Sequence, residues 1–109
     1  MMDGVEHYLS RAEIAYRESD VEQAVIDAEK AVELCGDSER MIALRIFIAR
    51  CYSKLGKIEK SNEIYRSLIN EDVYLPPIIM GLMHNNLVEG KSEKLERNVQ
   101  IVKIFLGGA

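Results

Sequence analysis

The 109-residue sequence contains no tryptophan, and it has only two each of phenylalanine, proline, histidine and cysteine. No stretch approaches the roughly 18 apolar residues of a membrane-spanning helix, so we expect no membrane segment. The opening residues MMDGVEHYLSRAE lack the basic flank and the apolar stretch of a secretory signal. Two lone thiols, Cys35 and Cys51, do not make a disulfide framework, and we expect a cytoplasmic protein.

The residues that usually carry catalysis are also sparse. His7 and His84 lie far apart, and neither is followed three or four residues later by a side chain that would complete a zinc pair. No nucleophile elbow, Cys/His motif or glycine-rich phosphate loop is present. We therefore expect no enzymatic activity, no metal and no cofactor. The sequence leaves open the possibility of an active site assembled from residues that are distant in the chain. A closed pocket containing His84 and a carboxylate would indicate such a site.

Basic residues are outnumbered, with 14 Lys and Arg against 18 Asp and Glu, a net charge of −4. Because binding to phosphate backbones requires a basic surface, nucleic acid is not an expected partner. The charge is also unevenly distributed. Residues 1–40 contain 11 acids and 4 bases, net −7, whereas residues 41–109 contain 7 acids and 10 bases, net +3. Opposite charges on the two halves permit head-to-tail association of copies, so a homo-oligomer is possible.

Helix signals recur along the chain. Asp3 with Glu6, and Ser19 with Glu22, have the spacing of a capping box, which predicts that Asp3 and Ser19 each begin a helix. Three apolar-periodic segments are followed by glycines that can adopt the left-handed conformation closing a helix, namely Gly36, Gly56 and Gly90.

Apolar residues follow helical periodicity, and no segment alternates as a strand would. The pair Pro76-Pro77 suits the first turn of a helix, where a backbone N–H has no partner. The expected fold is all-α, with helices at about 4–18, 20–35, 38–55, 58–70, 77–89 and 92–106 in a single domain of residues 1–109.

An internal repeat appears when the sequence is compared with itself at a spacing of 37 residues. Small residues then coincide with small ones and large apolar residues with large ones. The coincident pairs include Leu9 with Ile46, Ala12 with Ala49, Ser19 with Gly56, Val21 with Ile58 and Val32 with Ile69.

This repeat resembles the tetratricopeptide repeat (TPR), a helix–turn–helix of about 34 residues. The pattern falls on Ile48, Ala49, Tyr52, Ser61 and Tyr65 in one unit, and on Tyr8, Ala12, Ala15, Ala24 and Ala28 in the preceding unit. The resemblance implies a right-handed stack of antiparallel helix pairs, with three repeats at about 5–36, 38–72 and 76–106. A generic helical bundle is the alternative, since it also needs amphipathic helices and glycine turns.

In the family, the first helix of each repeat lines a concave groove that holds ligands. The resemblance places a mixed, largely apolar set of side chains in that groove: Leu9, Glu13, Tyr16 and Arg17; Ile46, Phe47, Arg50, Ser53 and Lys54; and Met80, His84 and Leu87. One TPR subtype clamps a terminal carboxylate with cationic and amide side chains. The corresponding positions of this sequence hold residues such as Leu9, Phe47 and Gly81, which cannot donate hydrogen bonds to a carboxylate from their side chains. We therefore do not expect this chain to bind a terminal carboxylate in that way.

Two functions fit these features. The first is a non-catalytic protein-binding adaptor whose groove accepts an apolar or amphipathic peptide segment. The second is a structural helical-repeat scaffold, in which a second copy or the chain's own C-terminal helix covers the apolar lining. The helix at 38–55 is apolar nearly all round, which also fits a middle helix packed on both sides.

Overall fold

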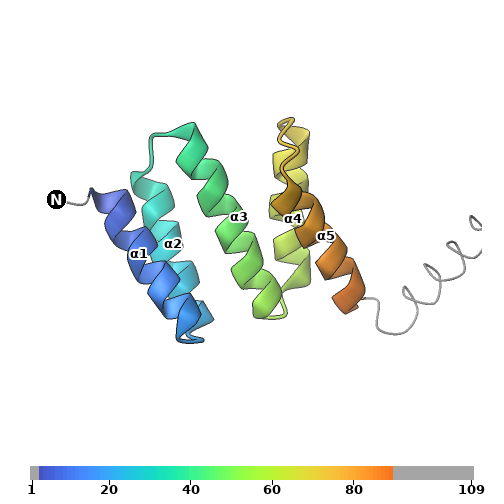
Figure 1. Cartoon of the computed structure of the whole chain (residues 1–109), viewed down its shortest axis with the longest axis horizontal. Coiled ribbons are helices and arrows are strands. Elements are labelled where there is room, and N and C mark those ends of the chain that lie inside the picture. The colour runs from blue at the N-terminus through green and yellow to red at the C-terminus, as the bar shows by residue number, and fades with distance from the viewer. Residues whose placement is uncertain (1–2, 90–109) are drawn as a thin grey trace, which may run out of the picture.

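Five helices follow one another in the computed structural model, which describes residues 3–89 (Figure 1). They are α1 (Gly4–Arg17), α2 (Val21–Leu34), α3 (Ser38–Lys54), α4 (Ile58–Asn70) and α5 (Pro76–Glu89). The all-α prediction is confirmed, since residues 3–89 contain no strand, and each of the five expected helices agrees to within one residue at either end. The sixth expected helix, 92–106, lies outside the described residues, as does Gly90.

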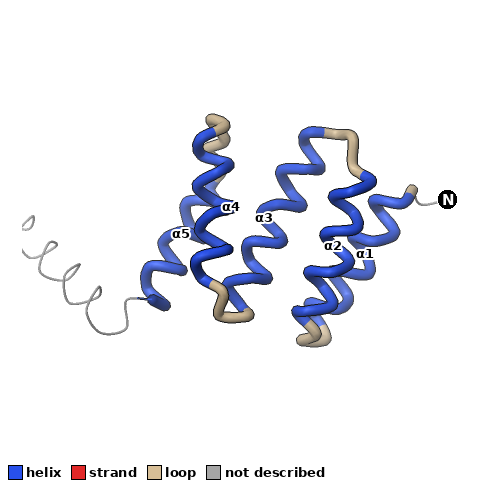
Figure 2. Tube along the Cα trace, turned by 180° about the vertical axis from the view of Figure 1, so that it is seen from behind, coloured by secondary structure: helices blue, strands red, loops and turns tan. Residues whose placement is uncertain are grey.

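The helices pack in chain order, each against the next. In addition to these sequential contacts, α3 packs on α5. Figure 1 shows α1 in front of α2 and α5 in front of α4, and the reversed view in Figure 2 exchanges them. Helices α1 and α5 therefore lie on one side of the molecule, and α2 and α4 lie on the other.

Several small residues are completely buried between the helices. Ala12, Ala24 and Ala49, which the repeat predicts to be buried, are each completely inaccessible, so this prediction is confirmed. A residue without a long side chain lets two helix backbones approach, and the neighbouring large residues fill the space beside it. The large residues that are almost fully buried are Leu44, Tyr65, Leu68 and Ile78.

The turn between α1 and α2 has the same hydrogen bonds as the turn between α3 and α4. Ser19 and Gly56 both have left-handed backbones, with φ of 66° and 79°. The following residues, Asp20 and Lys57, each donate to the carbonyl five residues earlier, in both cases at 2.8 Å. This is the Schellman arrangement that satisfies the last carbonyls of a helix.

Ser19 is therefore not the residue that begins a helix, contrary to the capping-box prediction. Asp20 is the N-cap of α2, and its carboxylate accepts a hydrogen bond from the Gln23 N–H at 3.3 Å. Asp3 is the N-cap of α1 as predicted, accepting from the Glu6 N–H at 2.8 Å. A side-chain oxygen in this position satisfies one of the free N–H groups of the first turn.

Gly36 does not close α2 with a left-handed residue, so that prediction is wrong. The helix ends at Leu34, and Cys35 is extended, with φ of −84° and ψ of 122°. The next residue but one, Asp37, caps α3 by accepting from the N–H groups of Glu39 and Arg40. An extended connection suits a chain that must cross from one helix pair to the next.

A buried polar network ties α5 to α3 and α4. The Asn85 amide donates to Ser61 Oγ at 2.9 Å and to Asn62 Oδ1 at 2.8 Å, and its oxygen accepts from Ser53 Oγ at 2.7 Å. The Ser61 hydroxyl donates to the Ala49 carbonyl at 2.7 Å. Because each buried polar group finds a partner only in this arrangement, the network fixes the rotation of α5 about its axis.

That rotation leaves much of α5 open. Only Ile78 and Asn85 are buried in this helix, although it contains few polar residues. Its large exposed apolar side chains are Ile79, Met80, Met83, Leu87 and Val88. A helix that is apolar all round is normally covered on more than one side.

Candidate functional site

An open pocket of about 330 Å³ lies between α1 and α3. Its walls are Glu13, Tyr16 and Arg17 from α1 and Phe47 and Arg50 from α3. The α1 residues follow helical spacing, so a single face of the helix presents them. The sequence placed all five in a groove, and the structure brings them together.

An aromatic pair forms the floor of this pocket. The ring centroids of Tyr16 and Phe47 are 5.7 Å apart and the rings are tilted by 54°. Both side chains are half-buried and pack against the core residues Ala15, Ala24 and Cys51. A rigid aromatic surface with one face in contact with the core offers apolar area at low cost in conformational entropy.

Two cations border the aromatic pair. The Arg50 guanidinium carbon lies 5.8 Å from the Tyr16 ring centroid, and the Lys54 ammonium nitrogen lies 5.1 Å from it. Both distances are within the range of cation–π attraction. Arg17 adds a third positive charge and Glu13 a single negative one. The pocket therefore combines an apolar floor with a net positive border.

Two of the expected groove residues have a largely structural setting. Leu9 is half-buried against the core residues Val5, Ala31 and Leu44. Ile46 is half-buried against the cluster that contains Ala49, Tyr65, Leu68 and Ile78. Neither borders the pocket between α1 and α3.

The remaining expected residues lie towards α5. Ser53 donates its hydroxyl hydrogen bond to Asn85 and so takes part in the buried network. Met80 is 67% exposed, and His84 and Leu87 are exposed as well. None of these α5 side chains borders the pocket, so the structure divides the expected groove set into a cluster between α1 and α3 and a separate surface on α5.

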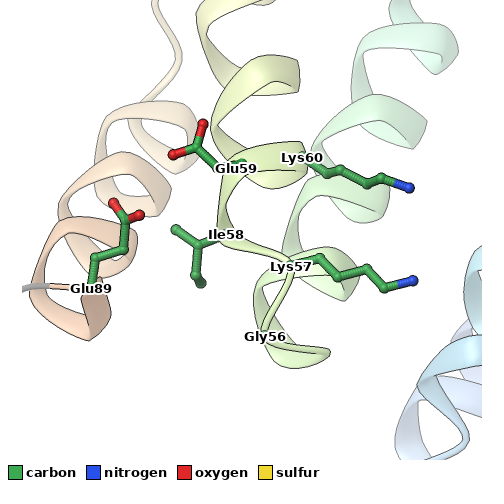
Figure 3. Close-up of a pocket in the computed structure, with 6 residues that line it drawn as sticks. All are labelled: Gly56, Lys57, Ile58, Glu59, Lys60 and Glu89. Atoms are coloured by element: carbon green, nitrogen blue, oxygen red, sulfur yellow. The ribbon is translucent and has the colours of Figure 1, made fainter.

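A larger hollow of about 540 Å³ lies at the turn between α3 and α4, beside the end of α5. Figure 3 shows Lys57 and Lys60 pointing away from Glu89, while Glu59 and Glu89 extend towards each other. The charged groups of opposite sign thus do not converge on one point. The hollow lacks the convergent polar groups that fix a small ligand.

Residues 3–89 contain no cluster of three or more His, Cys, Asp and Glu side chains that could hold a metal ion. Within the same part of the chain, no helix is long and apolar enough to cross a membrane. His84 is exposed on α5 and lines neither the pocket between α1 and α3 nor the hollow beside the end of α5.

Comparison with known proteins gives no family assignment. No family model, no curated protein and no solved structure matches this chain.

The contact between Tyr16 and Phe47, which are 31 positions apart, was not visible in the sequence as a pair. The spacing of 37 matches Tyr16 with Ser53 and so gave no direct indication of it. The two rings meet where residues of α1 and α3 line the same pocket.

Proposed function

We propose that this chain is a non-catalytic, TPR-like adaptor that binds an apolar or amphipathic peptide segment in the pocket between α1 and α3. The observation that carries the proposal is the aromatic pair Tyr16–Phe47, whose rings lie 5.7 Å apart in an open pocket. Aromatic anchors in pockets supply a disproportionate share of binding energy at protein interfaces. A cytoplasmic location accords with this role.

The TPR-like part of the proposal is supported by the matching turns. Ser19 and Gly56 are separated by the same 37 residues as the sequence repeat, and both have left-handed backbones. The fully buried pair Ala12 and Ala49 has that spacing too. Equivalent residues thus perform equivalent structural tasks in the first two helix pairs, as in stacked-repeat proteins.

The border of the pocket favours a ligand with an acidic group beside its apolar anchor. Arg50 can form a planar, two-pronged contact with a carboxylate, and Lys54 adds a second positive charge near the same ring. Glu13 disfavours a ligand that is acidic throughout. The expected ligand is therefore an amphipathic segment in which one aromatic or aliphatic side chain enters and a flanking carboxylate meets Arg50.

Selection of peptides from a random-sequence library against the immobilised protein tests this proposal. We expect enriched sequences that combine a large apolar residue with a nearby acidic one. The double variant Tyr16→Ala with Arg50→Ala should lose binding to the selected peptides and stay folded, with a lower unfolding midpoint because the Tyr16 ring packs against the core. As a control, Tyr74→Ala with Arg66→Ala removes an exposed aromatic and an exposed arginine away from the pocket and should bind normally. Equal binding by both double variants would refute the assignment.

Self-association through α5 is a second candidate function, favoured by a separate observation. Met80, Met83 and Leu87 are 67%, 60% and 59% exposed on one side of the helix. Contiguous exposed apolar side chains mark interaction surfaces in soluble proteins. Sedimentation over a concentration series should then show a dimer that Met83→Glu dissociates. A monomer at every concentration would exclude this function and leave the adaptor proposal intact.

A further inference from the structure

A buried carboxylate lies outside the pocket between α1 and α3. Asp27, on α2, is only 2% exposed, although most aspartates lie at the surface. Its Oδ2 is 3.8 Å from the Nε of Arg11, a distance too long for a hydrogen bond. Its Oδ1 is fully buried and has no hydrogen-bond partner among the residues that the structure describes.

This carboxylate forms part of the wall of a third pocket, of about 220 Å³, between α1 and α2. The pocket is lined by Arg11, Ile14, Ala15, Glu18, Asp20, Gln23 and Asp27. Three of these side chains are acidic and one is basic, so the formal charge of the lining is −2. Ile14 and Ala15 supply an apolar wall beside the acidic groups.

A buried carboxylate oxygen without a donor is costly, because the charge has left water and gained nothing in return. Arg11 only partly offsets the negative charge of Asp27. Its side chain is 53% exposed, and its Nε lies 3.8 Å from Asp27 Oδ2. Because Oδ1 has almost no accessible surface, a donor that enters the pocket from outside would satisfy it once the side chains over this oxygen shift aside. The negative lining specifies that this donor is a cation, and no set of three metal-ligating side chains occurs within residues 3–89.

We propose that this pocket, hereafter the Asp27 pocket, accepts an arginine side chain of a partner protein. Arginine fits better than lysine because its guanidinium is more weakly hydrated and loses less on entering a buried site. Its several N–H groups suit a pocket whose lining includes the carboxylates of both Asp27 and Glu18. The aliphatic part of the arginine side chain would lie along Ile14 and Ala15.

The Asp27 pocket is distinct from the pocket between α1 and α3. Glu13, Tyr16 and Arg17 of α1 line one pocket, whereas Arg11, Ile14 and Glu18 of the same helix line the other. The two sites therefore use different faces of α1. One can be removed by mutation without loss of the other, and the arginine proposal does not depend on the proposed adaptor function.

The direct test is a nuclear magnetic resonance titration of the whole chain with N-acetyl-arginine methylamide. The matched control ligand is the citrulline analogue, which has nearly the same shape and no charge. We expect the arginine compound to shift the amide resonances of Ala15, Gln23 and Asp27 in a saturable way. The citrulline compound should bind at least about tenfold more weakly, as expected for loss of a charged hydrogen-bond partner.

Substitutions test whether the Asp27 carboxylate binds the arginine compound. Asp27→Asn keeps the size of the side chain and should lower the affinity for the arginine compound by about tenfold or more. Glu33→Gln removes an acid that is exposed elsewhere on α2 and should leave the affinity within about twofold, since exposed charges interact weakly. Arg11→Gln removes the competing cation and should tighten binding.

Three results would overturn the proposal. The first is equal affinity for the arginine and citrulline compounds, which would mean that the positive charge contributes nothing to binding. The second is unchanged affinity in a folded Asp27→Asn variant. The third is the absence of saturable shifts at Ala15, Gln23 and Asp27 in the wild-type chain.

Discussion

Ser19 and Gly56 adopt the same left-handed backbone conformation at equivalent turns, 37 positions apart. Glycine adopts this conformation without strain, whereas a residue with a Cβ loses about 1–2 kcal/mol. One of two matching turns thus carries a residue that fits it poorly. Nothing in the described contacts of the Ser19 side chain explains the choice of serine.

The first prediction concerns an exchange between these turns. Ser19→Gly should stabilise the protein by about 0.5 kcal/mol, because the relief of strain exceeds the added freedom of the unfolded chain. Gly56→Ser should destabilise it by about 1 kcal/mol for the opposite reason. Urea unfolding of both variants gives the two signs. Changes of the same sign would show that the turns are not equivalent.

Gly81 of α5 lies against the ring of Tyr65. A Cβ at this position would be 2.6 Å from Tyr65 Cε2, closer than van der Waals contact allows. Gly81→Ala should therefore cost about 1–3 kcal/mol by overpacking, although alanine is the better helix former. Gly36→Ala is the control, because its Cβ would meet nothing within 4 Å, and it should be neutral or slightly stabilising. Thermal melts that rank the two variants in the reverse order would contradict this packing.

Asn85→Ala should be among the most destabilising substitutions in α5. It removes the shared partner of Ser61, Asn62 and Ser53. The buried Asn62 side-chain oxygen then loses its donor, which costs about 1–3 kcal/mol, whereas the Ser61 hydroxyl keeps its bond to the Ala49 carbonyl. Asn86→Ala changes an exposed neighbour and should have an effect below about 0.5 kcal/mol. The comparison is made by chemical denaturation. A small loss at Asn85 would mean that water replaces the amide freely.

The ion pair between Arg45 and Glu71 predicts a pH dependence. The Arg45 guanidinium donates to both carboxylate oxygens, at 3.1 and 2.9 Å, and these hydrogen bonds lower the pKa of Glu71 below its ordinary value of 4.5. Because the pKa is lower in the folded state, the pair stabilises the protein above the unfolded-state pKa, and this stabilisation is lost as the pH falls through the folded-state pKa.

Arg45→Gln should consequently reduce stability near neutral pH, and the difference from the wild type should shrink in acid. A titration of the Glu71 carboxyl carbon followed by nuclear magnetic resonance measures the pKa directly. An unshifted pKa, or a stability difference that grows in acid, would exclude the pair. Ser67 also contacts this carboxylate, at 3.4 Å, and Ser67→Ala serves as the milder variant.

The two cysteines should differ in reactivity. Cys51 is fully buried, and burial raises its thiol pKa to about 11, so very little thiolate exists at neutral pH. Cys35 is partly accessible, in a connection between helix pairs. Alkylation of the folded protein followed by mass spectrometry should modify Cys35 first and Cys51 only on unfolding. Equal rates would indicate that the Cys51 region opens readily.

The sequence predicted the five helices well because helical periodicity and the residues that end helices are local properties. The role of Ser19 was mistaken because two adjacent residues, Ser19 and Asp20, are both good N-cap residues, and the tight turn requires one of them to close the preceding helix. The repeat pairs Ser19 with Gly56, a residue expected to close a helix, and this pairing indicated the observed role of Ser19. The prediction for Gly36 was wrong because α2 ends at Leu34 and the extended residue Cys35 leads the chain to the next helix, so no left-handed glycine is required.

The candidate site was partly predictable. The resemblance to the TPR assigned Tyr16 of α1 and Phe47 and Arg50 of α3 to the groove, and the structure has all three lining one pocket. The positions of His84 and Met80 depend on the rotation of α5, which the Asn85 network sets through contacts with two other helices, α3 and α4. The buried Asp27 resembles a surface charge in the sequence, since its burial depends on how α1 covers α2.

The order in which the helices pack also bears on how the chain folds. Within the described residues, the main helix contacts join neighbours in the sequence or, for α3 and α5, the next but one. Few long loops must close before such contacts form, so the entropic barrier is low and folding within about microseconds to milliseconds is expected. The α1–α2 pair contains its own turn and caps. It can therefore begin to form while later helices are still being synthesised, and Leu44, Ile48 and Cys51 of α3 then complete its core.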